Sequence, residues 1–268
     1  MEDRKYGIAA MMNDAVSLPS STEQLYTNFK SAQPFPHLVL ENLFPSEILD
    51  NILEEIPPMT DEKWVHDQNA HVVKSNLRSA VHLGKKTEQF VAFVHSAKFL
   101  YLLSELTGVK ALLPDPYLGG GGYHVVPAGG KFDVHADRNI DQNSGLARRL
   151  SVLIYLNKEW KPEYGGQLEL WDQSGSRCEK VIEPTFNRTV IFQITDQNFH
   201  GVRPVLALDR ARKAFVLYYH TVPSENLIPH QSIYAPSLYL TKEPLHKRLL
   251  KDLSPPLLLR AFKRVRTR

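Results

Sequence analysis

The sequence predicts a mainly β fold, of the sandwich, jelly-roll or barrel kind, preceded by supporting α-helices. Between residues 111 and 222, short apolar or alternating segments are separated by Gly, Pro, Asn and Asp, which is typical of short antiparallel strands. The clearest helical spacing of apolar residues lies before residue 110. The chain has 268 residues, of which 43% are apolar and 10% aromatic, an ordinary globular composition that allows a substantial core.

The first part of the chain divides into a polar lead-in and a helical support. Residues 1–34 are rich in small polar residues, so we expect a loosely ordered lead-in without a function of its own. Residues 35–110 should provide the helical support and a substrate loop. The elements expected there are a strand at 35–40, a helix from Pro45 to Pro57, and a helix at 87–106 that Gly108 ends.

The segment between the two expected helices, residues 59–84, is polar and irregular. It is long enough to be a functional loop rather than a mere connection. We therefore expect the choice of substrate to be made here. The side chains that suggest this role are Trp64, His66, His71, Lys74 and Arg78.

Residues 111–222 carry the strand pattern, and we expect them to form the catalytic core. The alternation and the Gly, Pro, Asn and Asp breaks indicate seven short strands. After residue 222 the chain becomes rich in Pro and then basic, so residues 223–268 should form an amphipathic C-terminal extension. The expected strands are 122–127, 131–136, 150–156, 167–171, 179–182, 189–193 and 214–220.

The formal net charge of +3 conceals an asymmetry along the chain. Residues 242–268 carry a net +7, which leaves −4 on the rest. A basic tail on a mildly acidic body is not the pattern of a nucleic-acid-binding fold, which needs a basic face on the folded domain. We interpret the tail first as a solvated helix capping the barrel. The alternative is weak peripheral contact with an anionic membrane.

Other functional classes are excluded by what the sequence lacks. Its longest apolar runs fall far short of the roughly 18 to 20 residues of a membrane-spanning helix. The first residues show neither the basic start nor the apolar stretch of a secretory signal, so we expect a cytoplasmic protein. The single cysteine, Cys178, excludes an intrachain disulfide and a thiolate cage, so any metal must be held by His and carboxylate. The oligomeric state stays open.

A candidate metal site is formed by the sequence His135-Ala136-Asp137 together with His200. Residues two apart on a strand project from the same face, so His135 and Asp137 can hold one ion together. His200 follows another strand-like run and supplies a third ligand. Two imidazoles and one carboxylate leave coordination positions open, which is the pattern of non-haem Fe(II) oxygenases.

Such an enzyme needs a cation that receives the far carboxylate of 2-oxoglutarate, and Arg212 is the candidate. Its planar fork suits a carboxylate better than the neighbouring Lys213, and strand alternation places the two on opposite faces. Arg210 is a competitor for this role. Tyr155 should face the barrel interior and complete the pocket, on the same face of its strand as Arg149.

Several further motifs occur in the order in which one known family has them. Beside His135-Ala136-Asp137 and His200 with Arg212, these are Tyr155 to Trp160, Gly165-Gly166, Ile182-Glu183-Pro184 and Asn187-Arg188. The chain resembles the prolyl-hydroxylase-like 2-oxoglutarate/Fe(II) dioxygenases over roughly residues 114–221, and most of all their bacterial members. The resemblance implies a double-stranded β-helix, a form of jelly roll, with N-terminal supporting helices.

The resemblance also implies the activity and the site. His135, Asp137 and His200 would ligate Fe(II), Tyr155 and Arg212 would bind 2-oxoglutarate, and ascorbate would keep the iron reduced. The enzyme would be a hydroxylase that couples oxidation of its substrate to decarboxylation of 2-oxoglutarate to succinate. A peptidyl proline or other residue, an amino acid, another small molecule and a glycan stay open as substrates. Further candidates for contact with substrate or ligands are Tyr123, His124, Arg149, Tyr218 and Trp64.

Two alternatives accompany this interpretation. The barrel could serve as a sensor that binds iron and 2-oxoglutarate without catalysis. The second alternative is a related iron enzyme that demethylates or desaturates its substrate. The position of the substrate decides which reaction occurs, and these motifs do not specify that position.

Overall fold

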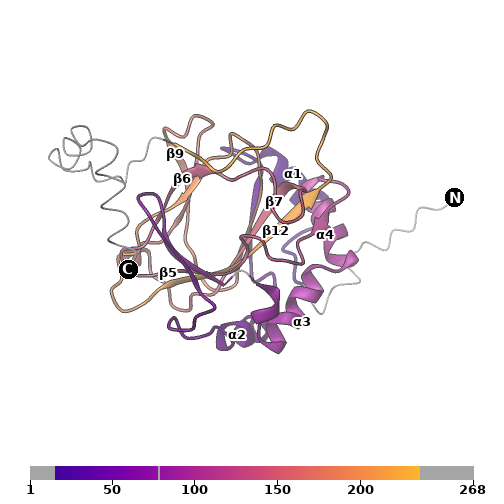
Figure 1. Ribbon diagram of the computed structural model, residues 1–268. Coiled ribbons are helices and arrows are strands. Elements are labelled where there is room, and N and C mark those ends of the chain that lie inside the picture. The colour runs from indigo at the N-terminus through magenta and orange to yellow at the C-terminus, as the bar shows by residue number, and fades with distance from the viewer. Residues whose placement is uncertain (1–15, 78, 236–268) are drawn as a thin grey trace, which may run out of the picture. The chain divides into compact units, whose positions relative to one another are not determined.

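The computed structural model describes residues 16–77 and 79–235, and it shows two antiparallel sheets with helices on one side (Figure 1). The larger sheet has eight strands in the order β1-β10-β7-β12-β5-β3-β2, with β4 paired to β12. Its strands are β1 (His37–Glu41), β2 (Val65–Gln68), β3 (Val73–Leu77), β4 (Leu113–Pro114), β5 (Gly122–Val126), β7 (Ala147–Tyr155), β10 (Arg188–Gln193) and β12 (Arg212–Thr221).

The smaller sheet has five strands in the order β13-β6-β11-β8-β9. The inner faces of the two sheets contribute apolar side chains to one cluster, with Leu153 and Val216 from the larger sheet and Leu168 from the smaller. This architecture is a double-stranded β-helix, so the predicted fold class, mainly β with N-terminal supporting helices, is confirmed. The strands of the smaller sheet are β6 (Phe132–Ala136), β8 (Leu168–Trp171), β9 (Cys178–Ile182), β11 (His200–Val202) and β13 (Ile233–Tyr234).

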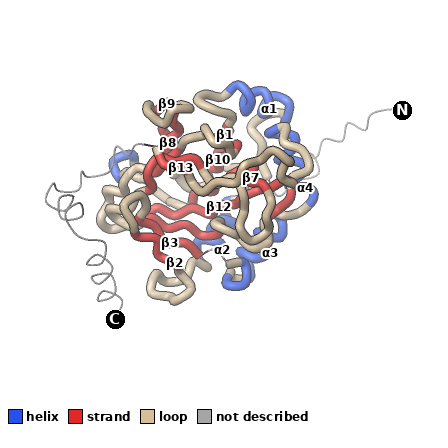
Figure 2. Tube along the Cα trace, turned by 45° about the horizontal axis from the view of Figure 1, so that its top comes forward, coloured by secondary structure: helices blue, strands red, loops and turns tan. Residues whose placement is uncertain are grey.

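The helices cover the outer face of the larger sheet (Figure 2). Side chains alternate along β12, so Phe215 and Tyr219 point outward while Val216 and Tyr218 point between the sheets. Phe215 packs edge-on against Phe90, and the Tyr219 hydroxyl donates a hydrogen bond to the Val94 carbonyl at 3.0 Å. The outer face is thereby sealed, and the inner face is left for chemistry. The helices are α1 (Thr22–Ser31), α2 (Ser46–Glu54), α3 (Lys85–Val94) and α4 (Ala97–Thr107).

The structure differs from the expected N-terminal lead-in, because part of it is the helix α1. Ser21 caps this helix by accepting a hydrogen bond from the Gln24 amide, and Leu25 and Phe29 are buried against the core. An apolar pair four residues apart suffices for one buried helical face in this short, otherwise polar segment. Residues 1–15 of the lead-in and the basic tail at 242–268 lie outside the described residues.

The single helix expected over residues 87–106 is two helices, α3 and α4. The side chain of Ser96 accepts a hydrogen bond from the Phe99 amide and so starts a new helix at residue 97. Gly108 ends α4 in the left-handed conformation, with φ of 73°, as expected of a C-cap. None of the helices in the described ranges is long and apolar enough to cross a membrane.

The expected loop at 59–84 contains a β-hairpin, β2 and β3. Asn69 closes its turn by accepting hydrogen bonds from the His71 and Val72 amides. β3 pairs with β5, so the hairpin extends the larger sheet at its edge. The hairpin escaped prediction because β2 is largely exposed and the buried positions of β3 include the polar Ser75 and Asn76, so neither strand shows the apolar alternation that identifies strands.

Candidate metal centre

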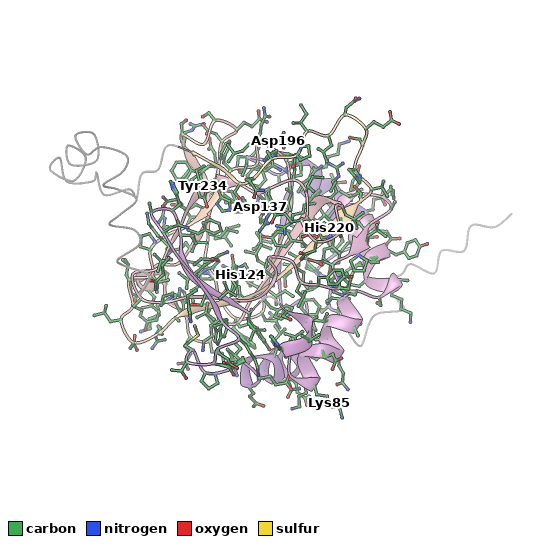
Figure 3. The ribbon with its side chains drawn as sticks, viewed as in Figure 1. Lys85, His124, Asp137, Asp196, His220 and Tyr234 are labelled. Carbon is green, nitrogen blue, oxygen red and sulfur yellow. The ribbon has the colours of Figure 1, made fainter. Side chains whose placement is uncertain are left out.

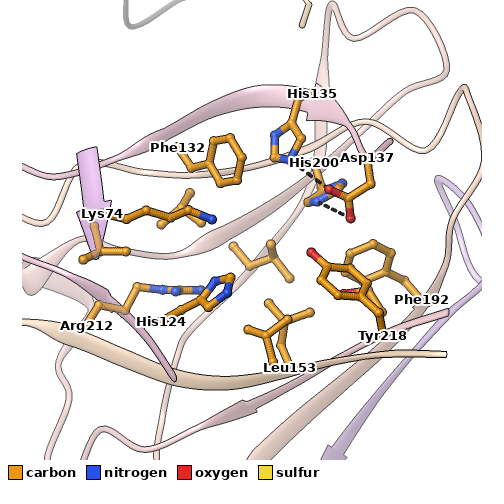
Figure 4. A pocket seen from close by; sticks show the side chains of 15 residues that line it. Lys74, His124, Phe132, His135, Asp137, Leu153, Phe192, His200, Arg212 and Tyr218 are labelled. Atoms are coloured by element: carbon orange, nitrogen blue, oxygen red, sulfur yellow. Dashed lines mark ion pairs between the residues drawn. The ribbon is translucent and has the colours of Figure 1, made fainter. Parts of the chain in front are cut away.

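The strand register brings the three predicted ligands together. His135 lies in β6 with Asp137 directly after the strand, and His200 begins β11, where it pairs with His135 across the two antiparallel strands. The His135 Nε2 lies 3.3 Å from Asp137 Oδ1, and the His200 Nε2 lies 3.8 Å from Asp137 Oδ2. Figure 4 shows the two rings and the carboxylate converging on one point, each at most 7% exposed.

The orientation of these side chains fits a bound cation. The Nδ1 atoms of His135 and His200 lie 2.8 Å and 3.1 Å from the Asp133 and Asn198 carbonyls, so each Nδ1–H donates to the backbone and each Nε2 lone pair is left free. The buried His135 Nε2 and Asp137 Oδ2 make no hydrogen bond with any part of the chain that is described. Leaving such atoms unsatisfied costs about 1 to 3 kcal/mol each, which a metal ion bound between them would offset.

The protonation states at neutral pH suit metal binding. The pKa of His200 is lowered to about 4, mainly by burial. His135 also lowers this pKa, and its effect is larger than the opposing effect of Asp137. Burial alone would raise the pKa of Asp137, but the two imidazoles and Arg148 hold it well below its usual range. Metals bind neutral imidazole and ionised carboxylate, so His200 and Asp137 are already in the states that an ion needs.

Arg212 begins β12 and lines the same cavity as the three ligands, on the opposite side of it in Figure 4. Its guanidinium is fixed by two hydrogen bonds, from Nε to the Gly166 carbonyl at 2.8 Å and from Nη2 to the Tyr155 hydroxyl at 3.2 Å. Tyr155 is fully buried beside it. The competitor, Arg210, stacks over Tyr164 and pairs with Asp209 outside this cavity.

Of the further candidates, His124 and Tyr218 line the cavity, whereas Tyr123 does not. Alternation along β5 points His124 between the sheets (Figure 3) and Tyr123 outward under the helices. The Tyr123 hydroxyl bonds to Thr87 and to the Ile52 carbonyl, so this residue belongs to the core. The Nε2 of His124 lies 2.9 Å from the Gly120 carbonyl, so this nitrogen is already engaged in a hydrogen bond.

Trp64 also belongs to the core rather than to the substrate pocket. Its side chain is 5% exposed within the apolar cluster beneath the helices, and its Nε1 donates to the Pro58 carbonyl at 3.0 Å. Trp64 lies just before β2, and the chain turns its ring inward there. A large aromatic residue in a polar segment is as easily an anchor for that segment as a contact for a ligand.

Arg149 does not face the cavity, although Ser151 and Leu153 of the same strand do. Tyr219 pairs with Leu150 but His220 pairs with Arg148, so Arg149 is an additional residue, a β-bulge. The bulge reverses the alternation before it. The Arg149 Nε therefore donates to the Thr221 hydroxyl, and Arg148 takes the inward position over the Tyr218 ring.

Two residues that line the metal cavity are not singled out as such by the sequence: Phe132 and Lys74. The Phe132 ring stacks on the His135 ring with centroids 3.8 Å apart, and the Lys74 ammonium lies 4.5 Å from the Phe132 centroid. Lys74 was expected only as one residue of a specificity loop, whereas it lies on β3 and lines the metal cavity. Among its companions, His66 bonds to the Ser75 hydroxyl, His71 lies beside Asp133, and Arg78 is outside the described residues.

A second buried group, Asp115, Asp141 and His220, has residue types that metals favour, with one potential ligand atom of each within 4.8 Å of the others. Its carboxylates are already engaged: Asp115 accepts from the Gly119 amide and Asp141 from the Ser144 amide. Arg148 Nη2 lies 3.6 Å from Asp141 Oδ1 and supplies positive charge. We interpret this group as a structural ion cluster.

The cluster has a consequence for the pH dependence of stability. His220 is 1% exposed, and neither of its ring nitrogens has a hydrogen-bond partner within residues 16–77 and 79–235. Burial lowers the pKa of His220 from 6.5 to about 4; Arg148 lowers it too, and Asp141 opposes this. Between these pH values the unfolded chain binds a proton that the folded chain does not. The contribution of His220 to stability is therefore fully present above pH 6.5 and is lost as the pH falls toward 4.

Replacing His220 with Gln should remove this dependence. Between pH 6.5 and 4 we expect the free energy of unfolding of the wild type to fall more steeply than that of the variant, by at most about 1.4 kcal/mol per pH unit. Urea unfolding of both proteins at several pH values measures the two slopes. Equal slopes would show that His220 is not held neutral by burial.

Comparison with known proteins agrees with this geometry. Residues 121–220 match the family model of the 2OG-Fe(II) oxygenase superfamily. Among curated proteins, mouse prolyl hydroxylase EGLN3 is 31% identical over 83 residues, which are 31% of this chain and 33% of that protein. Mouse prolyl 3-hydroxylase OGFOD1 is 30% identical over 69 residues, 24% of this chain and 13% of that protein. The chain thus matches a third or less of the length of these relatives.

Solved structures share the fold. A Pseudomonas putida prolyl-4-hydroxylase aligns with a TM-score of 0.56 and 17% identity, over 76% of this chain and 100% of that one. A prolyl hydroxylase from Trichoplax adhaerens, solved with a peptide fragment of the hypoxia inducible factor oxygen degradation domain, aligns with a TM-score of 0.52 and 21% identity, over 80% and 90% of the two chains. The matched family model spans the strands that carry all three candidate ligands and Arg212. Residues 121–220 of this protein, which carry the three candidate ligands and Arg212, are thus similar in sequence to the 2OG-Fe(II) oxygenase superfamily.

Proposed function

We propose that the protein is an Fe(II)- and 2-oxoglutarate-dependent dioxygenase that hydroxylates an organic substrate and converts 2-oxoglutarate to succinate. The observation that carries this proposal is that His135, Asp137 and His200 meet on one side of a cavity whose other side presents Arg212. An iron site alone would fit many activities. A buried guanidinium facing that site provides for a second, anionic ligand.

Each residue has a distinct role in this proposal. His135, Asp137 and His200 would hold Fe(II), which when bound supplies the activation of oxygen and of the keto acid. Arg212, held in place by Tyr155, would bind the far carboxylate of 2-oxoglutarate. The apolar side chains of Leu153, Phe192 and Val216 keep water from the space between.

The curated relatives are named as prolyl hydroxylases, which makes prolyl peptides the first substrates to test. Free amino acids, other peptidyl residues and glycans belong in the same panel. A gain of one oxygen on the substrate, measured by mass spectrometry, would distinguish hydroxylation from demethylation or desaturation.

The proposal is tested by succinate release from the purified chain with Fe(II), 2-oxoglutarate, ascorbate and the substrate panel in air. We expect succinate that disappears under nitrogen or with an iron chelator. Anaerobic titration of Fe(II) and 2-oxoglutarate onto the protein is the companion measurement. Tight binding of both without succinate from any substrate would favour the sensor alternative over the enzyme.

A further inference from the structure

A second hollow of about 230 Å³ adjoins the metal cavity. It shares Lys74, Phe132, Asp137 and Tyr218 with that cavity, so a molecule bound in it would lie directly beside the metal ligands. Its remaining wall comes from the β2–β3 hairpin, the Gly120 loop, Arg138 after Asp137, Arg148 at the start of β7, and the segment around β13.

The wall of this hollow carries more positive than negative charge. Lys74, Arg138 and Arg148 contribute cationic groups. Of its two acids, Asp137 is a candidate metal ligand and Asp67 accepts a hydrogen bond of 2.6 Å from the Asn76 amide. A hollow with this balance concentrates anions.

The two arginines differ in how their charge is satisfied. Arg148 Nη2 donates to the Gly119 carbonyl and lies 3.6 Å from Asp141, and its guanidinium stacks 4.0 Å over the Tyr218 ring. Arg138 forms no hydrogen bond or ion pair with any residue in the described ranges, although it is only partly exposed. It is the cation of this wall that still lacks an acceptor.

The arginines are held close to each other. A nitrogen of Arg148 lies 3.1 Å, and one of Arg138 3.6 Å, from the point where a Cβ on Gly120 would stand. Gly120 has φ of 85° and no side chain, which allows both guanidiniums to approach its backbone. Burial and the neighbouring Arg148 lower the pKa of Arg138. The fold therefore keeps two like charges together on the wall of the hollow, an arrangement that an anion would stabilise.

We propose that the substrate carries a carboxylate or phosphate group that binds Arg138, with Arg148 beside it, so that a neighbouring C–H bond lies next to the metal. This inference rests on the proposed function and names the substrate class of the same site. The amides of Asn69 and Asn76 and the hydroxyl of Ser232 provide further polar groups for an anionic, hydrogen-bonding molecule. A neutral substrate would cover Arg138 and leave it without an acceptor.

Kinetics with matched pairs of probes tests the inference. Each pair is an acid and its amide: aspartate and asparagine, glutamate and glutamine, and short peptides that contain Asp or Asn. A further pair, O-phosphoserine and serine, tests whether a phosphate group takes the place of the carboxylate. We expect acids to stimulate succinate release at least about tenfold better than their amides, because a charge-assisted hydrogen bond is lost in the amide. Free acids and acidic peptides separate a small-molecule substrate from a side chain.

The variant Arg138→Gln should lose the preference for acids over amides, whereas the variant Arg138→Lys should keep part of it. Arg177→Gln is the matched control, because Arg177 is exposed and pairs with Glu179 on β9, outside the hollow. Thermal unfolding of each variant shows whether it is folded. Equal use of acids and amides by the wild type, or an unchanged preference in folded Arg138→Gln, would overturn the inference and leave the proposed function intact.

A second measurement does not depend on turnover. Phenylglyoxal modifies accessible arginines, and peptide mass spectrometry reports the extent at Arg138 itself. Inorganic phosphate or acetate should slow modification of Arg138 several-fold in the Fe(II)-loaded protein and leave Arg177 unaffected. No protection at Arg138 would overturn the inference. Protection in a protein that forms no succinate would instead count against the proposed function and leave the anion subsite standing.

Discussion

Replacing Asp137 with Ala is expected to abolish succinate formation. Asp137 supplies the carboxylate among the three candidate ligands. Its Oδ1 lies 3.3 Å from the Nε2 of His135, and its Oδ2 lies 3.8 Å from the Nε2 of His200. Removing a partner that only supports a metal ligand costs about 10- to 100-fold in metal affinity or activity, so removing a ligand should cost more. Succinate release should fall by well over about 100-fold, and anaerobic Fe(II) titration should show weaker binding.

The control for this variant is Asp209→Ala. Asp209 is exposed and pairs with Arg210 away from the cavity, so its loss changes the net charge equally without touching the site. His135→Ala should behave as Asp137→Ala does. Undiminished succinate formation in both ligand variants, with both folded, would end the proposal of an iron site here.

The variant Arg212→Met is expected to weaken the use of 2-oxoglutarate. Arg212 is 2% exposed, and its Nε and Nη2 are fixed by Gly166 and Tyr155, so no other cation can take its position. Truncating one partner of a buried charge pair costs about 2 to 5 kcal/mol, which corresponds to a rise of at least about 30-fold in the KM for 2-oxoglutarate. Fe(II) affinity should change little, because Arg212 is not a ligand.

Lys213→Met provides the comparison. It removes one positive charge from the next residue of β12, whose side chain points to the other face of the sheet. Succinate release at a range of 2-oxoglutarate concentrations gives the KM for each variant. An unchanged KM in Arg212→Met would move the carboxylate site elsewhere, with Lys74 and Arg148 as the next candidates on the cavity wall.

The convergence of the three candidate ligands could be predicted because their geometry follows from local rules. His135 and Asp137 are two residues apart near a strand end, and short apolar strands with clear breaks identify the two sheets. The inward placement of Arg212 rather than Lys213 follows from alternation in the same way, and the structure points Arg212 into the cavity. These inferences need only the periodicity of a strand.

The wall on the substrate side could not be predicted, because it depends on pairing between distant segments. The bulge at Arg149 arises from the register between β7 and β12, which no local pattern records. Tyr123 and Trp64 look like ligand contacts in the sequence, but which face the helices cover decides that they are core. The division of the chain at residues 34, 110 and 222, the role of the tail and the cytoplasmic location stay predictions.

The β2–β3 hairpin contacts both the larger sheet and the strand that bears His135, because the His71 carbonyl in its turn accepts a hydrogen bond from the Asp133 amide of β6 at 2.8 Å. It is the outermost pair of the larger sheet, attached through β3 and β5, yet Lys74 and Asn76 reach the wall of the hollow. A change in the length of this hairpin would therefore shift the wall of the hollow and the support of His135 at the same time. Retargeting the proposed catalyst thus calls for side-chain substitutions on the hairpin rather than for grafting the whole segment.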